Sequence, residues 1–209
     1  AELFSVLERL GTTPLPPYIK KPELTEAEAR QKYQSVFAHE AGSVAAPTAS
    51  LHFTPQLIAN LKAAGHDVMY VTLHVNRGTF APLTEQQITS GRLHEETYSI
   101  AIETAEFLNK AKAQGRPIVA VGTTVLRTLE SVTHNGKLEV LQDTTDLFIR
   151  EGYAFKFIDA LITNFHVPKS SLLMLVAALV GREQILNIYR DAIERKFRLF
   201  SFGDGMLII

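Results

Sequence analysis

The sequence predicts an α/β fold, namely a mainly parallel sheet with helices on both faces in a Rossmann-like three-layer arrangement. Two observations lead to this prediction. Short apolar runs typical of buried strands alternate with segments of helical periodicity. Polar residues also gather where an expected strand ends and a helix begins, which is where open α/β sheets bind ligands. With 209 residues, 46% of them hydrophobic, the chain can form one large domain with a full core.

The first elements are a stiff segment, two helices and a strand. Residues 14–18 are rich in proline and should be extended. Residues 23–34 are charged and helix-prone. Thr54 is a typical helix cap before a proline, and it predicts a helix with an inward apolar face that ends at Gly65. Residues 68–75 predict a strand.

The middle of the chain continues the alternation. We expect a helix over 102–114, an apolar strand over 117–122, a helix over 123–132, a tight turn at Asn135-Gly136 and a strand over 138–141.

The stretch over 161–180 is the most informative. An apolar run passes into Thr163, Asn164, His166 and Ser170 and then directly into a second apolar run. We expect a buried strand, a polar loop and a buried helix, followed by an amphipathic helix over 183–197 and a strand pair over 200–209. The loop is either a ligand site or only the cap of a helix.

Composition limits the class of protein. The net charge of −1 attracts no nucleic acid by itself, so an RNA surface must be local. The chain has no cysteine, which excludes thiolate catalysis and fits a cytoplasmic location. The longest apolar run is too short to cross a bilayer, so no membrane partner is expected. Histidine–glutamate zinc motifs, the two common nucleotide-binding glycine motifs and the hydrolase Gly-x-Ser-x-Gly motif do not occur.

Four further polar clusters lie near the ends of expected elements: residues 42–53, 72–80, 92–98 and 122–127. His52 and His74 could each be a base or a core histidine. Glu96 stands beside a histidine and could serve in acid/base chemistry or mark a solvated helix start. Thr123, Thr124 and Arg127 could hold an anion at a helix N-terminus, or be an ordinary cap and a surface cation.

Taken together, these blocks resemble one family. The segments SVAAPTASLHF (43–53), TLHV (72–75), GTF (78–80), VGTT (121–124), TNFH (163–166) and FGD (202–204) are similar to the S-adenosylmethionine:tRNA ribosyltransferase-isomerase of queuosine biosynthesis. The matches are collinear. The family also carries an amino-terminal part and an inserted β-barrel domain, which implies that this chain is the carboxyl-terminal portion. We therefore expect a lead-in over 1–35 and an α/β catalytic domain over 36–209.

The resemblance implies a reaction. S-adenosylmethionine donates its ribosyl group to the 7-aminomethyl-7-deazaguanine base at the tRNA wobble position. The product is epoxyqueuosine, and adenine and methionine leave. No metal or other cofactor is expected, and the enzyme should be a cytoplasmic monomer.

The resemblance also suggests roles for individual residues. A base is sought among His52, His74 and His166, and Glu96 or Asp204 would meet the acceptor amine. Thr123, Thr124 and Arg127 would hold the methionine carboxylate, and Asn164 and His166 would contact ribose or adenine. The other substrate-binding candidates are Ala46, Pro47, Thr48, Thr79 and Ser170, and the tRNA-binding candidates are Lys20 and Lys21.

Two other functions stay open from the sequence. One is a nucleotide- or RNA-binding α/β domain without catalysis. The other is a divergent transferase that uses S-adenosylmethionine on a small molecule. Asn76 and Arg77 stand near positions where the family has glycine, and they leave room for an altered substrate preference.

Overall fold

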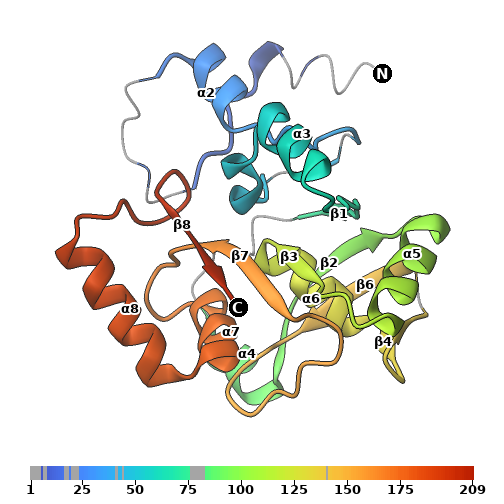
Figure 1. The fold of residues 1–209 in the computed structure, drawn as a ribbon. Coiled ribbons are helices and arrows are strands. Elements are labelled where there is room, and N and C mark those ends of the chain that lie inside the picture. The colour runs from blue at the N-terminus through green and yellow to red at the C-terminus, as the bar shows by residue number, and fades with distance from the viewer. Residues whose placement is uncertain are drawn as a thin grey trace.

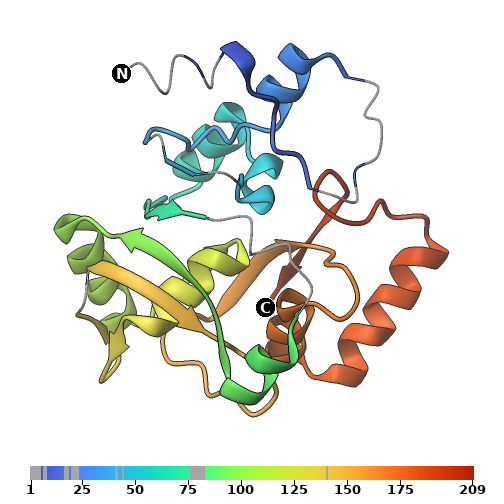
Figure 2. The same cartoon turned by 180° about the vertical axis from the view of Figure 1, so that it is seen from behind.

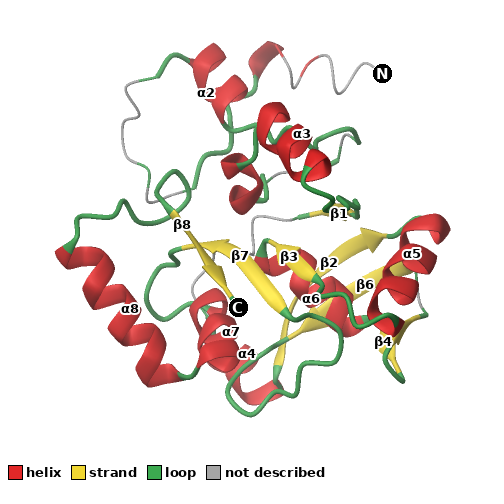
Figure 3. Ribbon diagram, in the orientation of Figure 1, coloured by secondary structure: helices red, strands yellow, loops and turns green. Residues whose placement is uncertain are grey.

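Two three-stranded sheets and a hairpin organise the part of the chain that the structure describes (Figure 3). The structure is a computed structural model, and it describes residues 6, 9–16, 19, 24–40, 42–43, 45–75, 83–139 and 141–209. The first sheet has the order β1-β2-β6, from Thr72–His74, Arg92–Ser99 and Gln142–Leu147, with both pairs antiparallel.

The second sheet has the order β3-β7-β8 and carries the polar loop over 165–170. Its strands are Val119–Val121, Ala160–Asn164 and Gly205–Ile208. Strands β3 and β7 are parallel, whereas β8 returns antiparallel to β7. The hairpin consists of β4 (Thr133–His134) and β5 (Lys137–Leu138), joined through the expected turn at Asn135-Gly136.

The prediction of one mainly parallel, Rossmann-like sheet was wrong. Only β3 and β7 form a parallel pair among the described strands. The error came from β2 and β6, whose sequences RLHEETYS and QDTTDL are too polar to signal strands. These two strands pair with each other across the chain, and this pairing satisfies their backbone groups without an apolar run. The molecule is a mixed α/β structure.

Six helices lie close to the expected windows, whereas η1 and α4 were not predicted from the sequence. They are α2 (Glu26–Lys32), η1 (Thr48–His52), α3 (Pro55–Ala63), α4 (Glu85–Ser90), α5 (Ile102–Ala113), α6 (Thr123–Ser131), α7 (Ser171–Val180) and α8 (Arg182–Glu194). Thr54 caps α3 as predicted, because its hydroxyl accepts from the Leu57 N–H at 3.1 Å. The expected inward face of α3 was wrong, since no residue of this helix is buried and Leu57 is 38% exposed.

The core is one apolar cluster to which both sheets and helices α5, α6, α7 and α8 contribute. Leu126 of α6, Leu161 of β7 and Val176 of α7 are completely buried in one apolar cluster. The two opposite views in Figures 1 and 2 show α2, η1 and α3 grouped on one side and the other helices around the sheets. Strand β7 therefore has the core on one side and η1 close to its carboxyl end.

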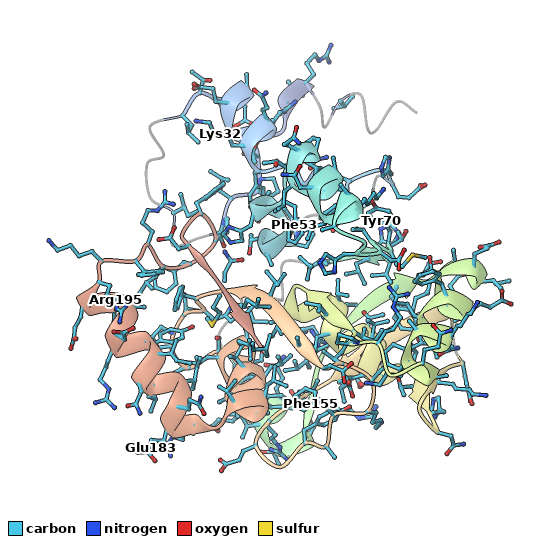
Figure 4. All side chains as sticks on the ribbon, viewed as in Figure 1. Lys32, Phe53, Tyr70, Phe155, Glu183 and Arg195 are labelled. Carbon is cyan, nitrogen blue, oxygen red and sulfur yellow. The ribbon has the colours of Figure 1, made fainter. Side chains whose placement is uncertain are left out.

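Aromatic side chains pack together in the region that contains α2, η1 and α3. The ring of Phe37 lies 5.6 Å from that of Phe53 and 5.7 Å from that of Tyr70. Figure 4 shows Phe53 and Tyr70 in the layer of η1 and α3. The ring of Tyr33, just after α2, lies 5.8 Å from that of Phe202 in the loop before β8. The lead-in segment is thus held against the carboxyl-terminal loop.

Helices α7 and α8 meet at a sharp bend. Within the described residues, no single helix is long and apolar enough to cross a membrane. Only α7 and α8 taken together reach that length and composition, and their axes differ by 110°.

Candidate functional site

A pocket lies where β7 ends, α6 begins and η1 crosses above them. Its volume is about 60 Å³. The residues that line it come from the segments most informative in the sequence: Ala46, Pro47, Thr48, Ala49, Val75, Gly122, Thr123, Thr124, Thr163, Asn164, Phe165, His166, Val167, Ser170, Leu172, Phe200 and Ser201. The structure therefore brings together eight of the predicted site residues, from Ala46 to Ser170.

The N-terminus of α6 opens into this pocket without a side-chain cap. Gly122 occupies the cap position with φ of 96°, a left-handed backbone conformation that suits glycine. The N–H groups of Thr123 and Thr124 bond to no described residue, and neither do their hydroxyls. Both residues are nevertheless buried. Uncapped N–H groups at a helix start attract anions, so this corner is suited to a carboxylate or phosphate.

Asn164 connects the pocket to η1. Its Nδ2 lies 2.9 Å from His52 Nε2 and donates to the Phe200 carbonyl at 3.3 Å. Its Oδ1 accepts from the Thr48 hydroxyl at 3.1 Å. Asn164 is almost completely buried, and its amide is held by two residues of η1 and by the loop before β8. His52 itself is half-buried and does not line the pocket.

His166 is a neutral side chain in the pocket wall. Burial lowers the pKa of His166 to about 4, because charging the ring away from water is unfavourable. Its Nε2 lies 2.9 Å from the Thr163 hydroxyl. The Tyr189 hydroxyl accepts from the His166 N–H and donates to its carbonyl, and burial raises the pKa of Tyr189 to about 12. The ring is therefore held firmly, and it is uncharged at neutral pH.

Ser170 forms the predicted helix cap. Its hydroxyl accepts from the Leu173 N–H at 3.2 Å and donates to the Val167 carbonyl at 2.7 Å. The residue lines the pocket, but its hydrogen-bonding capacity is largely used by the backbone.

Asp204 closes the loop before β8. Its carboxylate accepts from the Arg198 guanidinium and from the Arg198 N–H, both at 2.8 Å. The hydrogen bond from Arg198 lowers the pKa of Asp204. Asp204 does not line the pocket, although it follows Phe200 and Ser201, which do.

Glu96 and Arg127 are not brought to the pocket. They form a buried ion pair of 2.9 Å between β2 and α6, with side chains 3% and 5% exposed. Arg127 Nε also donates to the Leu147 carbonyl at 2.9 Å. Burial lowers the pKa of Arg127, and the charge of Glu96 opposes that change. The interpretation of residues 92–98 as a helix start was wrong, because Glu96 lies on a strand. The structure gives no support for Arg127 as the carboxylate ligand, since its guanidinium is used inside the protein.

The remaining candidates lie elsewhere. His74 is on β1 and half-buried, and a Cβ on Gly42 would come within 2.9 Å of its Nδ1. His74 does not line the pocket, whereas the next residue, Val75, does. Thr79, Lys20 and Lys21 lie outside the described residues. No group of three histidine, aspartate or glutamate side chains in the described ranges could hold a metal ion.

Sequence reasoning assigned no individual role to several residues that form the site. Thr163 holds the His166 ring, and Tyr189 fixes the His166 backbone from α8. Tyr189 lies within the amphipathic helix expected over 183–197, and in the sequence only its hydroxyl indicated a polar partner. Phe200 contributes a carbonyl through a backbone with φ of 72°, which nothing in the sequence indicates.

Comparison with known proteins places this geometry in a family. The family described as queuosine biosynthesis protein matches residues 1–208. A protein of Carboxydothermus hydrogenoformans named S-adenosylmethionine:tRNA ribosyltransferase-isomerase is 53% identical over 98% of this chain. A protein of the same name from Natranaerobius thermophilus is 51% identical over 97% of the chain.

The chain spans 59% and 58% of the lengths of these two relatives. A crystal structure of an S-adenosylmethionine tRNA ribosyltransferase from Thermotoga maritima is similar with a TM-score of 0.62 and 44% identity. The similarity covers 78% of this chain and 51% of that one. The family model covers almost the whole chain, and the relatives agree with it over the same residues. The chain belongs to the queuosine biosynthesis protein family.

Proposed function

We propose that the full-length protein transfers and isomerises the ribosyl group of S-adenosylmethionine onto the 7-aminomethyl-7-deazaguanine base of tRNA. The product is epoxyqueuosine, with release of adenine and methionine. Residues 36–209 form the α/β catalytic part, and 1–35 are a lead-in. The names of the relatives support this reaction, but the chain spans only about 59% of their length.

One observation in the site carries the proposal. The buried start of α6 presents N–H groups and the hydroxyls of Thr123 and Thr124, and no described residue uses them. These groups border the pocket and have no partner among the described residues, so they are available to a ligand that accepts hydrogen bonds. The methionine carboxylate of S-adenosylmethionine has the matching charge and acceptor oxygens.

The size of the pocket indicates how much of the ligand this chain holds. Small-molecule sites usually enclose about 300–1,000 Å³. The 60 Å³ of this pocket therefore suits one end of S-adenosylmethionine rather than the whole molecule. The rest of the ligand and the tRNA would be held by other parts of the full-length protein.

The other pocket residues receive roles consistent with their environment. Asn164 and His166 contact the ribose or adenine, and neutral His166 offers hydrogen bonds without a charge. Ala46, Pro47 and Thr48 form the wall on the η1 side. For tRNA, Lys20 and Lys21 stay the proposed contacts.

Mass spectrometry tests the reaction. The full-length protein is incubated with S-adenosylmethionine and tRNA carrying the aminomethyl-deazaguanine base, and the digested nucleosides are analysed. We expect epoxyqueuosine and one equivalent of free adenine. Methylated base without adenine release would overturn the proposal, as would turnover of a small molecule in the absence of tRNA.

A further inference from the structure

The orientation of the Asn164 amide is fixed by a backbone carbonyl. The Phe200 carbonyl can only accept a hydrogen bond, so the amide atom 3.3 Å from it must be the NH₂ group. The Thr48 hydroxyl then donates to the amide oxygen at 3.1 Å. Reversing the amide would place two acceptor oxygens against each other at Phe200, so the amide has its NH₂ group on the Phe200 side.

This orientation determines which nitrogen of His52 carries a proton. An amide NH₂ group can only donate, and it lies 2.9 Å from His52 Nε2. Nε2 must therefore be the nitrogen with the lone pair, and a neutral ring must carry its proton on Nδ1. A doubly protonated ring would set an N–H against the NH₂ group and lose this hydrogen bond.

The Nε2 edge of His52 is also closed by β8. A Cβ added to Gly205 would lie 3.0 Å from Nε2 and 3.2 Å from Cδ2, so the glycine backbone packs against this edge. Nδ1 makes no hydrogen bond to any residue that the structure describes. The one ring nitrogen left for an outside partner thus bears a hydrogen.

We propose that Asn164 is a positioning residue that reserves Nε2 of His52, so that His52 offers its Nδ1–H as a hydrogen-bond donor and does not act as the proton acceptor. The role of His52 in turnover rests on the proposed function, whereas the position of its proton does not. The expectation of His52 as a general base is replaced by a donor to an acceptor atom of the substrate, such as a ring nitrogen or a hydroxyl oxygen.

Imidazole nitrogen spectroscopy tests the position of the proton. The full-length protein is labelled with ¹⁵N-histidine, and long-range ¹H–¹⁵N spectra are recorded, with His52 assigned through His52→Asn. We expect the Nδ1–H pattern at His52. The exposed His66, His94 and His134 serve as references in the same spectrum and should show the ordinary Nε2–H preference of histidine in water. An Nε2–H pattern at His52 would overturn the proposal.

A change at Asn164 should move the proton. Asn164→Asp replaces the donor by an acceptor, so His52 should shift to the Nε2–H pattern. Thr48→Val removes only the hydroxyl on the other side of the amide and should keep the Nδ1–H pattern. If the pattern of His52 stays the same in Asn164→Asp, a structural role alone explains the contact and the proposal fails.

Turnover separates a donor from a base. The amide of His52→Asn can place an N–H near the position of Nδ1, but it cannot accept a proton. We expect His52→Asn to keep adenine release within about tenfold of the wild type and His52→Ala to lose at least tenfold more. Equal losses of about 10²–10⁴ in both variants would contradict the donor role.

Different results would contradict the proposed function and the proposed position of the His52 proton. If the wild type shows the Nδ1–H pattern but makes no epoxyqueuosine, the proposed function is wrong and the positioning of His52 stands. If epoxyqueuosine forms while His52 shows Nε2–H, the function stands and this inference is wrong.

Discussion

Helix α6 carries two groups of buried polar residues that differ in whether the protein satisfies them. At its N-terminus, Thr123 and Thr124 face a pocket and bond to no described residue through their hydroxyls. Further along, Arg127 and Glu130 are buried among their own partners. Both groups look alike in the sequence, since each consists of polar residues on one amphipathic helix. A polar group on this helix is therefore a candidate for ligand binding only where its hydrogen bonds are unmade and it also borders the pocket. The buried Thr128 hydroxyl meets only the first condition, because it has no partner but does not line the pocket.

Glu130 shows the satisfied case most fully. Its carboxylate accepts from the N–H groups of Lys156, Phe157 and Ile158 at 2.8, 2.9 and 2.9 Å, and from the Tyr153 hydroxyl at 3.2 Å. Burial and the negative charge of Glu130 raise the pKa of Tyr153, which keeps its hydroxyl a donor. Glu130 thus fixes the chain that leads into β7, and the Glu96–Arg127 pair fixes α6 to the other sheet.

The largest effect is expected at the buried ion pair. Arg127→Met removes the cation beside Glu96, and we expect the free energy of unfolding to fall by about 3–5 kcal/mol, because a buried carboxylate loses its charged partner. Urea unfolding of the full-length protein measures this loss. The double variant Glu96→Gln/Arg127→Met should recover part of the stability. A loss below 1 kcal/mol in Arg127→Met would break the contrast between the two groups.

The next largest effect is the pH dependence of stability that is caused by His166 in the pocket wall. The pKa of His166 is about 4 when folded and 6.5 in the unfolded reference, so the unfolded chain binds more protons in between. The stability from neutral His166 is complete above pH 6.5 and is lost as the pH falls toward 4. This amounts to roughly 3 kcal/mol.

Urea unfolding of the wild type and of His166→Asn between pH 7 and pH 4 measures this contribution. The variant should show the shallower dependence on pH. His134→Asn, at an exposed histidine, should follow the wild type. Parallel curves for the wild type and His166→Asn would contradict the buried, neutral state of His166.

A smaller loss is expected when Glu130 keeps its shape but loses its charge. Glu130→Gln replaces one acceptor oxygen of the carboxylate with an NH₂ group, which cannot accept hydrogen bonds from the facing N–H groups. We expect the free energy of unfolding to fall by about 1–3 kcal/mol. Glu139→Gln, at an exposed glutamate, should change it by less than about 0.5 kcal/mol. Chemical unfolding measures the free energy of unfolding of both variants. Equal losses in the two variants would show that Glu130 does not anchor residues 156–158.

The smallest effect on stability is expected at the N-terminus of α6. Thr124→Val removes a hydroxyl that no described residue uses, so stability should change by less than about 0.5 kcal/mol. Affinity for S-adenosylmethionine should fall by about tenfold, the value of one hydrogen bond of about 1.4 kcal/mol. Scanning calorimetry of the full-length protein measures the change in stability, and titration calorimetry measures the change in affinity. A loss of stability with unchanged affinity would assign Thr124 to the scaffold instead.

Local patterns predicted much of the second sheet and its helices. The caps at Thr54 and Ser170, the turn at Asn135 and the start of α6 at Thr123 each depend on neighbours within a few residues, and the structure confirms them. The first sheet could not be predicted in this way. Strands β2 and β6 are polar, and they become strands only through each other, about 45 residues apart in the chain.

The contacts that distinguish residues available to a ligand from residues paired inside the protein are also long-range. Asn164 meets His52 across 112 positions, and Arg127 meets Glu96 across 31. A sequence shows the residue types but not these partners, which is why Arg127 looked as suitable for the ligand as Thr123. The resemblance to a family added the order of the blocks, but it could not tell a satisfied group from an open one.

We propose that the open N-terminus of α6, and not the buried Arg127, holds the carboxylate of S-adenosylmethionine. The decisive experiment is calorimetric titration of the full-length protein with S-adenosylmethionine and with its decarboxylated form. We predict that the wild type and Glu130→Gln both prefer the carboxylated ligand by at least tenfold, and that Thr123→Val/Thr124→Val loses most of this preference. Equal affinity of the wild type for both ligands would contradict the claim, as would a preference that the double variant retains in full.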